Sequence, residues 1–307
     1  MPFPAAPGVP TFDQTWIHAV WSPKVLETFY DSTVLGSIAN TDYEGEIKQM
    51  GDSVEIRTRP KVTVRKYVKG QKLQYESGEP DKVTLKIDQG YYAAVSINDV
   101  DEVQSDIAIE NEYQSDMAEQ FKITQDTDVL GTIYLDVHAQ NKGATAGRKS
   151  SSINLGATGS PIAITKTNVA DYIAYCAQVL NEQNAPKDGR WMVIPEWMRT
   201  HIITNTDLKD ASITGDGTST LRSGLMGEVD GIKLYQSNLV SSVTDGADLC
   251  FRVLFGHKVG LAYAAQIEKT EPLRSQDDFA DLLRSLLICG WKVVKSEALG
   301  LLYCKRG

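Results

Sequence analysis

The chain has 307 residues, of which 42% are hydrophobic and 23% are charged, a composition typical of a folded globular protein with a substantial core. Its formal net charge of -9 argues against a protein whose main task is to grip nucleic acid. No window approaches about 18 consecutive apolar residues, so no membrane span is predicted. The four cysteines are widely spaced and form no C-x-x-C pair, which favours buried reduced thiols over disulfides or a zinc site.

The N-terminal region is predicted to be an arm over residues 1–50. Its first eight residues contain three prolines and lack the basic region and apolar core of a secretory signal, so we expect synthesis in a cytoplasm. A short helix is expected over residues 22–30, with Ser22 as the N-cap and Pro23 at the first helical position.

An extended hairpin is predicted over residues 53–90. Val54, Ile56, Val62, Val64 and Val68 all occupy even positions and would share one face of a strand, although Pro60 interrupts the run. A turn-rich stretch at 76–81 leads into a second alternating run. Between residues 57 and 72 the hairpin has seven basic side chains and no acidic one. These are Arg57, Arg59, Lys61, Arg65, Lys66, Lys69 and Lys72.

The next stretch has the opposite charge, with ten acidic residues and one basic residue between Asp99 and Asp128. Tyr113, Met117 and Phe121 recur every four residues, which predicts one long acidic helix over about 105–138, with a kink near Thr127. Seven of its carboxylates are candidate contacts for a partner. They are Asp101, Glu102, Asp106, Glu110, Glu112, Asp116 and Glu119.

The second half of the chain mixes helix and strand signals, which places the protein in the α+β class. Residues 140–166 are polar and glycine-rich and are predicted to be a flexible connection at a domain boundary. The expected helices follow at about 168–180 and 196–205, on either side of a buried strand at 191–195, and 206–223 are loop-like. Strands are expected at 259–267, 286–294 and 299–304.

No catalytic residue, metal ligand or cofactor is predicted. Residues 143–150 resemble a phosphate-binding loop, but the spacing of the glycines is one residue too short and Arg148 stands where the lysine should be. The four histidines, at 18, 138, 201 and 257, are too scattered for a metal site or a catalytic base. Carboxylates at 99, 101, 102 and 106 could hold a divalent metal, although a solvated helix start is the simpler interpretation.

Four segments together resemble the coat proteins of tailed phages with the Hong Kong 97-type fold, podovirus-like phages in particular. They are VTLKIDQGYYAAVSINDVDEVQSDIAIENEYQSDMAEQFKITQDTDVLGTI, RWMVIPEWMRTHIITN, LRSGLMGEVDGIKLYQSNLV and the strands that end the chain. In the first, Ile97, Asp99, Asp101, Gln104 and a late aspartate (Asp126 or Asp128) match the family's passage from strand to long helix. The resemblance covers roughly residues 35–304.

The resemblance implies a structural subunit rather than an enzyme. It implies an N-terminal arm (1–50), an extended hairpin loop (53–90), a peripheral domain with a spine helix (91–140 and 261–307) and an axial domain (165–260). Such subunits form hexamers and pentamers that close into an icosahedral shell around double-stranded DNA, without sequence-specific binding. A separate scaffolding protein and a portal protein are the implied partners, decoration proteins remain open, and the implied location is the virion capsid.

The opposite charges suggest the hypothesis that the basic hairpin of one subunit lies across the acidic helix of its neighbour. DNA binding by the hairpin and a merely solvated hairpin are the alternatives. For the whole chain, two alternative functions remain open. One is a bacterial nanocompartment shell of the same fold, and the other is a metal-dependent hydrolase that uses the carboxylates of 99–106.

Overall fold

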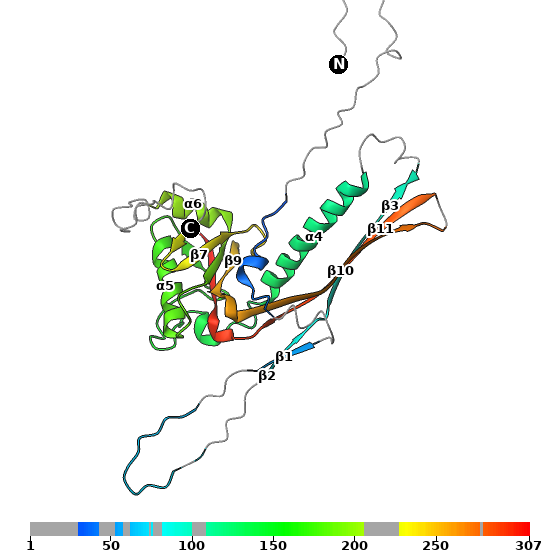
Figure 1. The fold of residues 1–307 in the computed structure, drawn as a ribbon. Coiled ribbons are helices and arrows are strands. Elements are labelled where there is room, and N and C mark those ends of the chain that lie inside the picture. The colour runs from blue at the N-terminus through cyan, green and yellow to red at the C-terminus, as the bar shows by residue number, and fades with distance from the viewer. Residues whose placement is uncertain are drawn as a thin grey trace, which may run out of the picture.

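The computed structural model describes residues 30–42, 53–57, 62–73, 75, 82–99, 109–205, 227–276 and 279–307. In these residues the strands form three sheets of two, three and seven strands (Figure 1). The α+β class predicted from the sequence is confirmed. No helix of the described residues is both long and apolar enough to cross a membrane.

The three-stranded sheet is antiparallel, in the order β10-β11-β3, and one long helix, α4, lies along it (Figure 1). Side chains from the second half of α4 fasten the helix to the sheet. Tyr91 Oη donates to Asp128 Oδ2 at 2.6 Å, and Trp291 Nε1 donates to Thr132 Oγ1 at 3.2 Å. The bounds are Gln89–Asn98 for β3, Ile109–Thr132 for α4, Leu261–Arg274 for β10 and Ala280–Val293 for β11.

The seven-stranded sheet is mixed, in the order β4-β12-β9-β5-β7-β6, with β8 also paired to β9. Helices α5 and α6 pack on it, and its central strand β5 is buried at all five residues. The bounds are Ile162–Ile164 (β4), Val169–Glu182 (α5), Arg190–Ile194 (β5), Glu196–Thr204 (α6), Glu228–Val229 (β6), Ile232–Gln236 (β7), Ser242–Asp245 (β8), Asp248–His257 (β9) and Leu299–Arg306 (β12).

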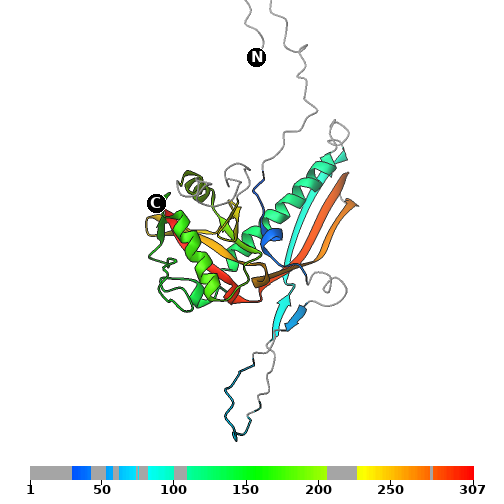
Figure 2. The same cartoon turned by 60° about the vertical axis from the view of Figure 1, so that its left-hand side comes forward.

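The two larger sheets meet at one end of the three-stranded sheet. Three chain crossings connect them there, through the 3-10 helices η2 (Ala139–Asn141), η3 (Lys258–Gly260) and η4 (Ser296–Ala298). A single apolar cluster fills the joint, with residues from α4, β5, β9 and β12. Residues 30–40, including the one-turn helix α1 (Leu35–Ile38), also lie in this joint (Figure 2).

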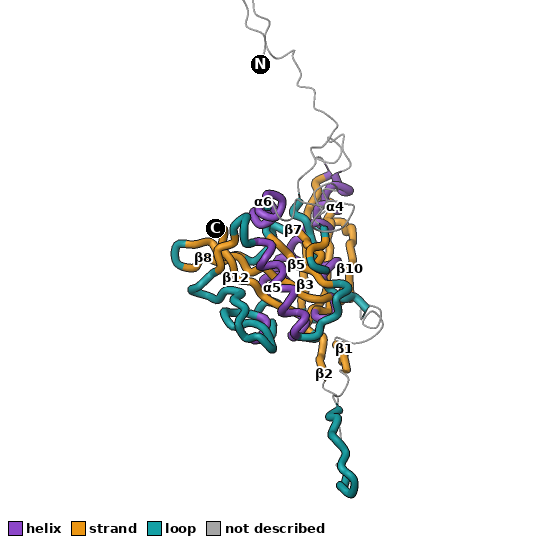
Figure 3. Tube along the Cα trace, turned by 90° about the vertical axis from the view of Figure 1, so that its left-hand side faces the viewer, coloured by secondary structure: helices purple, strands orange, loops and turns teal. Residues whose placement is uncertain are grey.

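The predicted hairpin is present at its base. Strands β1 (Ser53–Arg57) and β2 (Lys82–Lys86) pair antiparallel, and the chain between them projects away from both sheets (Figure 3). Residues 62–73 form a loop rather than the long strands that the alternating valines predicted. Val62, Val64 and Val68 alternate as in a strand, but all three are exposed to water and pack against no sheet. Their spacing therefore does not mark a strand.

Several expected boundaries need correction. The acidic helix is shorter than 105–138, and it runs as one helix through Thr127, where a kink was expected. The last strand, β12, joins β4 and β9 in the seven-stranded sheet, whereas the sequence placed it with the peripheral domain. Residues 140–166 are not a flexible connection, because Asn141, Ala146 and Leu155 are fully buried there. The helix expected at 22–30 and the loop at 206–223 lie outside the described residues, apart from Tyr30.

Candidate interaction surfaces

The hairpin is anchored firmly at its base. Ile56, Leu85 and Ile87 form a small buried cluster with Ala262 and Ala264 of β10. The backbone of β2 also passes directly over Gly290, where a Cβ would stand 2.1 Å from the carbonyl oxygen of Lys86. The base therefore fixes the direction in which the hairpin leaves the body.

The hairpin loop exposes an unusual amount of apolar surface. Val64 is 94% exposed and Tyr75 is 91% exposed, although both are large apolar side chains. Large apolar surfaces that face water commonly mark sites of protein contact. We call the described loop residues with exposed large apolar side chains the apolar tip. They are Val62, Val64, Tyr67, Val68, Leu73 and Tyr75.

Four of the predicted basic residues lie in the loop that carries the apolar tip, and Arg57 lies at the hairpin base. Arg57, Arg65, Lys66, Lys69 and Lys72 are all exposed. Arg59 and Lys61 lie outside the described residues. Within one subunit the hairpin loop projects from the body, whereas α4 lies along the three-stranded sheet toward its opposite end, so the loop does not reach the acidic helix of its own chain (Figure 1).

The acidic residues predicted on α4 are only partly free. Glu112 is exposed, whereas Asp116 accepts a hydrogen bond from Tyr30 Oη at 2.8 Å and Glu119 pairs with Lys122 at 2.6 Å. Asp101, Glu102 and Asp106 lie outside the described residues, and the side chain of Glu110 is not described. The first half of α4 buries Met117 alone among its described side chains up to Thr124, so it presents a large open flank.

Sequence reasoning did not single out Asp126 as a structural carboxylate. This residue is 1% exposed, and its carboxylate accepts the backbone N–H of Val34 at 2.5 Å and that of Leu35 at 3.3 Å. Burial raises the pKa of Asp126, and the two backbone N–H groups oppose that rise. Its position four residues before the buried Leu130 was the available signal, because it puts a carboxylate on the apolar face of the helix.

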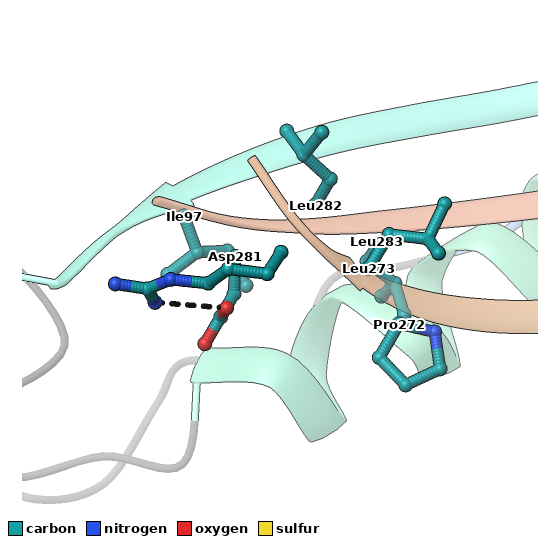
Figure 4. Close-up of a pocket in the computed structure, with 7 residues that line it drawn as sticks. Ile97, Pro272, Leu273, Asp281, Leu282 and Leu283 are labelled. Atoms are coloured by element: carbon teal, nitrogen blue, oxygen red, sulfur yellow. Dashed lines mark hydrogen bonds and ion pairs between the residues drawn. The ribbon is translucent and has the colours of Figure 1, made fainter. Parts of the chain in front are cut away.

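An ionic cluster closes the far tip of the three-stranded sheet. Arg274 of β10 donates to Asp99, which follows β3, at 2.7 Å. It also donates to Asp281 of β11 at 3.0 Å (Figure 4). Hydrogen bonding to Arg274 lowers the pKa of Asp99. Ile97, Leu273 and Leu283 line a shallow hollow beside the cluster. Asp99 is thus occupied by an arginine, and the described residues contain no group of three or more potential metal ligands.

The loop that resembles a phosphate-binding motif is already filled by a carboxylate of the same chain. Glu182, at the end of α5, accepts the backbone N–H groups of Lys149 at 2.7 Å and Ser150 at 3.0 Å. These bonds lower the pKa of Glu182 to about 2, and the bond from Ser150 has the largest effect. The groups that would cradle a phosphate therefore hold Glu182 instead.

Two of the four histidines have structural roles, and His18 lies outside the described residues. His138 and His257 each accept a backbone N–H two residues further along, from Gln140 and Val259, and so cap short helices. All four cysteines are buried and free. Burial raises the pKa of Cys289 to about 11 and that of Cys304 to about 12, so both are protonated thiols at neutral pH.

Comparison with known proteins identifies the class of structures that this fold resembles. No protein-family model and no curated protein matches the sequence. Among solved structures, one titled Mycobacterium phage Che8 has 26% identity and a TM-score of 0.75, over 94% of this chain and 98% of that one. The capsid structure of the cyanophage P-SCSP1u has 17% identity and a TM-score of 0.76, over 99% and 97%. The capsid of the cyanophage Pam1 has 13% identity and a TM-score of 0.69, over 97% and 98%.

The chain therefore has the fold of a phage capsid subunit over almost its whole length. The structures it resembles are titled as phages or as phage capsids, which is the class that the four sequence segments predicted.

Proposed function

We propose that this protein is the major capsid protein of a tailed phage, a structural subunit that assembles with copies of itself into a shell. The observation that carries the proposal is the end-to-end match to capsid subunits, which includes the projecting hairpin and the long helix. The loop between β1 and β2 exposes large apolar side chains to water, and this favours a second molecule that covers them.

We propose that the hairpin of one subunit lies on the open flank of α4 in the next. The tip and its surroundings supply cations, and the flank supplies Glu112 and its acidic neighbours. Single exposed ion pairs contribute only about 0–1 kcal/mol each, so charge sets the register and orientation of the contact. Burial of the apolar tip would supply most of the affinity, because each fully buried large side chain contributes roughly 1.5–3 kcal/mol.

The finer assignments follow from the Hong Kong 97-type resemblance. We propose hexamers and pentamers in an icosahedral shell that encloses double-stranded DNA without sequence-specific contacts. A separate scaffolding protein and a portal protein would be partners, with decoration proteins as a further class, and synthesis would take place in the host cytoplasm. The three-stranded sheet with α4 would be the peripheral domain, and the seven-stranded sheet, including β12, would be the axial domain.

The two other functions have less support. A nanocompartment shell would share the fold, but the similar structures described above come from phages. A hydrolase that uses the carboxylates of 99–106 would need Asp99, which Arg274 already holds.

Negative-stain electron microscopy of the purified full-length protein, alone and with a co-expressed scaffolding protein, tests the proposal directly. We expect closed particles of uniform size, or rings of five and six subunits. A chain that stays a folded monomer at every concentration, with and without the scaffolding protein, would contradict the proposed function. A particle filled with an enzyme would favour the nanocompartment.

A further inference from the structure

In the part of the chain that the structure describes, the three chain crossings join the two larger sheets at one end. Three chain crossings lie near the end of α4 and the starts of β10 and β12, whereas Arg274 and Ala280 mark the far tip of the three-stranded sheet. A body that is held at one end can rotate about that joint unless a second link fixes the angle. Hinge motion of this kind is a common form of conformational change in proteins.

Residues 30–40 form such a second link, and we call them the brace. Ser32 Oγ donates to the carbonyl oxygen of Gln236, and Ser237 Oγ donates to the carbonyl oxygen of Ser32. These bonds hold the brace to the seven-stranded sheet at 3.0 and 3.1 Å. Its apolar side chains, including Ile38 at 0% exposure, fill the joint.

The brace is also fixed to the other body. Asn40 pairs with β10 through two backbone bonds, one to the carbonyl oxygen of Leu261 at 2.8 Å and one from the N–H of Tyr263 at 3.0 Å. Along α4 it is bonded at Asp126 and again at Asp116. These two positions are ten residues apart, which is about 15 Å along a helix. A link with that span resists rotation of the helix in a way that a single point of contact would not.

Asp126 is the most constrained of these attachments. It is the one buried carboxylate among the described residues, and its two bonds go to the backbone at the start of α1. Hydrogen bonds to a charged acceptor are roughly twice as strong as neutral ones, and an unsatisfied buried N–H is costly. Loss of this side chain would therefore leave two buried donors without an acceptor.

We propose that the brace fixes the angle between the two sheets of each subunit, and that Asp126 is the positioning residue that locks it. This inference rests on the proposed function in one respect, namely that the angle sets the curvature of the shell. The rest concerns the single chain and holds whether or not the chain forms shells.

The first experiment uses unassembled full-length protein. Spin labels on Ser96→Cys in β3 and Ala174→Cys in α5, both exposed positions, report the distance between the two bodies. We expect one narrow distance distribution in the otherwise unchanged chain and a broad one after Asp126→Ala. Asp126→Asn keeps one acceptor and should broaden it less. Asp128→Asn is the matched control, because Asp128 bonds Tyr91 and not the brace, and it should leave the distribution narrow.

Hydrogen exchange shows whether the bonds from the Val34 and Leu35 amides to Asp126 have been lost. In Asp126→Ala we expect the amides of Val34 and Leu35 to exchange at least about tenfold faster, since the loss of a charged acceptor exceeds one power of ten in an equilibrium constant. Fast exchange with an unchanged, narrow distance distribution would overturn the brace as the element that fixes the angle. Unchanged exchange of these two amides would contradict the role of Asp126 in holding the brace in place.

The third readout is the size of assembled particles. Asp126→Ala should give a wider spread of diameters or open sheets, and Asp128→Asn should give particles of one size. If Asp126→Ala gave particles of uniform size, the angle that the brace fixes would not set the curvature of the shell. If the unsubstituted chain formed no particles, the proposed function would fail, while the label distances would still decide the role of the brace.

Discussion

Gln183 donates its side-chain N–H to the Oδ1 atom of Asn141 at 2.8 Å, and this bond connects α5 to the crossing between α4 and the seven-stranded sheet. Asn141 is fully buried and uses its own amide to donate to the carbonyl oxygens of Glu297 and Leu299. One side chain therefore satisfies three groups from two other segments. A buried polar network of this kind is stabilising only while every member is paired.

Substitution of Asn141 by alanine should destabilise the subunit strongly. The change leaves Gln183 and two carbonyl groups without partners in a dry site, and each unsatisfied group costs about 1–3 kcal/mol. We expect a loss of roughly 3–5 kcal/mol in the free energy of unfolding, measured by denaturant titration. Asn111→Ala, at an exposed position of α4, is the matched control and should change it by less than about 0.5 kcal/mol. Equal losses in the two variants would contradict this account of Asn141.

Glu182 should make stability depend on pH in the acid range. Its pKa in the folded chain is lowered to about 2 by the N–H groups of Ser150 and Lys149. A lowered folded pKa adds stability above the ordinary carboxyl pKa, and this stability is lost as the pH falls from about 4.5 toward 2. Because water screens the site, we expect Glu182→Gln to cost only about 0.5–1 kcal/mol at pH 7 and nearly nothing near pH 2.

Thermal unfolding of both proteins across pH 2–7 would measure this difference. A gap between them that stayed constant over the whole range would show that the carboxylate charge is not what holds the loop. Glu297→Gln offers a control, since Glu297 is exposed and only its backbone carbonyl is used in the fold.

Two glycines should respond in opposite ways to alanine. At Gly290 a Cβ would collide with the backbone of Lys86, so Gly290→Ala should push the hairpin base from β11 and cost about 1–3 kcal/mol. At Gly131 in α4 a Cβ meets nothing within 4 Å, so Gly131→Ala should stabilise the protein by about 0.5–1 kcal/mol. Unfolding midpoints of the two variants give the comparison. Similar shifts in the same direction would mean that the hairpin base is not packed on β11 as described.

Charge reversal on the hairpin separates the three interpretations of its cations. If the hairpin rests on α4 of a neighbour, Arg65→Glu with Lys66→Glu should abolish particles in electron micrographs. Glu112→Lys in the same chain should restore part of the yield, because opposite charges then face each other again. DNA binding predicts that empty shells still form, and a solvated hairpin predicts no change.

The apolar tip calls for a separate test, since charge is not its main contribution. Val64→Ser with Tyr67→Ser removes apolar surface that is exposed in the single chain, so the free energy of unfolding should change little. Particle assembly should weaken by at least about tenfold in the concentration it requires, because the loss of two buried apolar contacts exceeds 1.4 kcal/mol. Wild-type assembly by this variant would contradict the apolar contact.

The sequence was sufficient for elements with a compact apolar pattern. The apolar stripe of α5 and the short apolar run of β5 were predicted near their observed bounds, whereas β3 was not predicted as a strand from its side-chain pattern. The pattern failed where burial comes from distant segments. Asn141 and Leu155 lie in a polar, glycine-rich stretch, and they are buried because β12 and α5 cover them.

The candidate surfaces divide in the same way. Composition revealed the opposite charges of the hairpin and α4, because charge is a local property of the sequence. It did not reveal that Asp126 binds Val34 or that Arg274 holds Asp99, since these partners are 92 and 175 residues apart. Contacts of that kind depend on the topology, and single-sequence periodicity carries no information about them.

The place of β12 has a consequence for the order of events in the cell. β12 follows both β4 and β9 in the sequence, yet it lies between them, so these two strands cannot join one sheet until β12 has been synthesised. The hairpin, by contrast, is synthesised early and is exposed from then on. A nascent chain therefore exposes its apolar loop to other molecules before β12 has completed the larger sheet on which the subunit body depends.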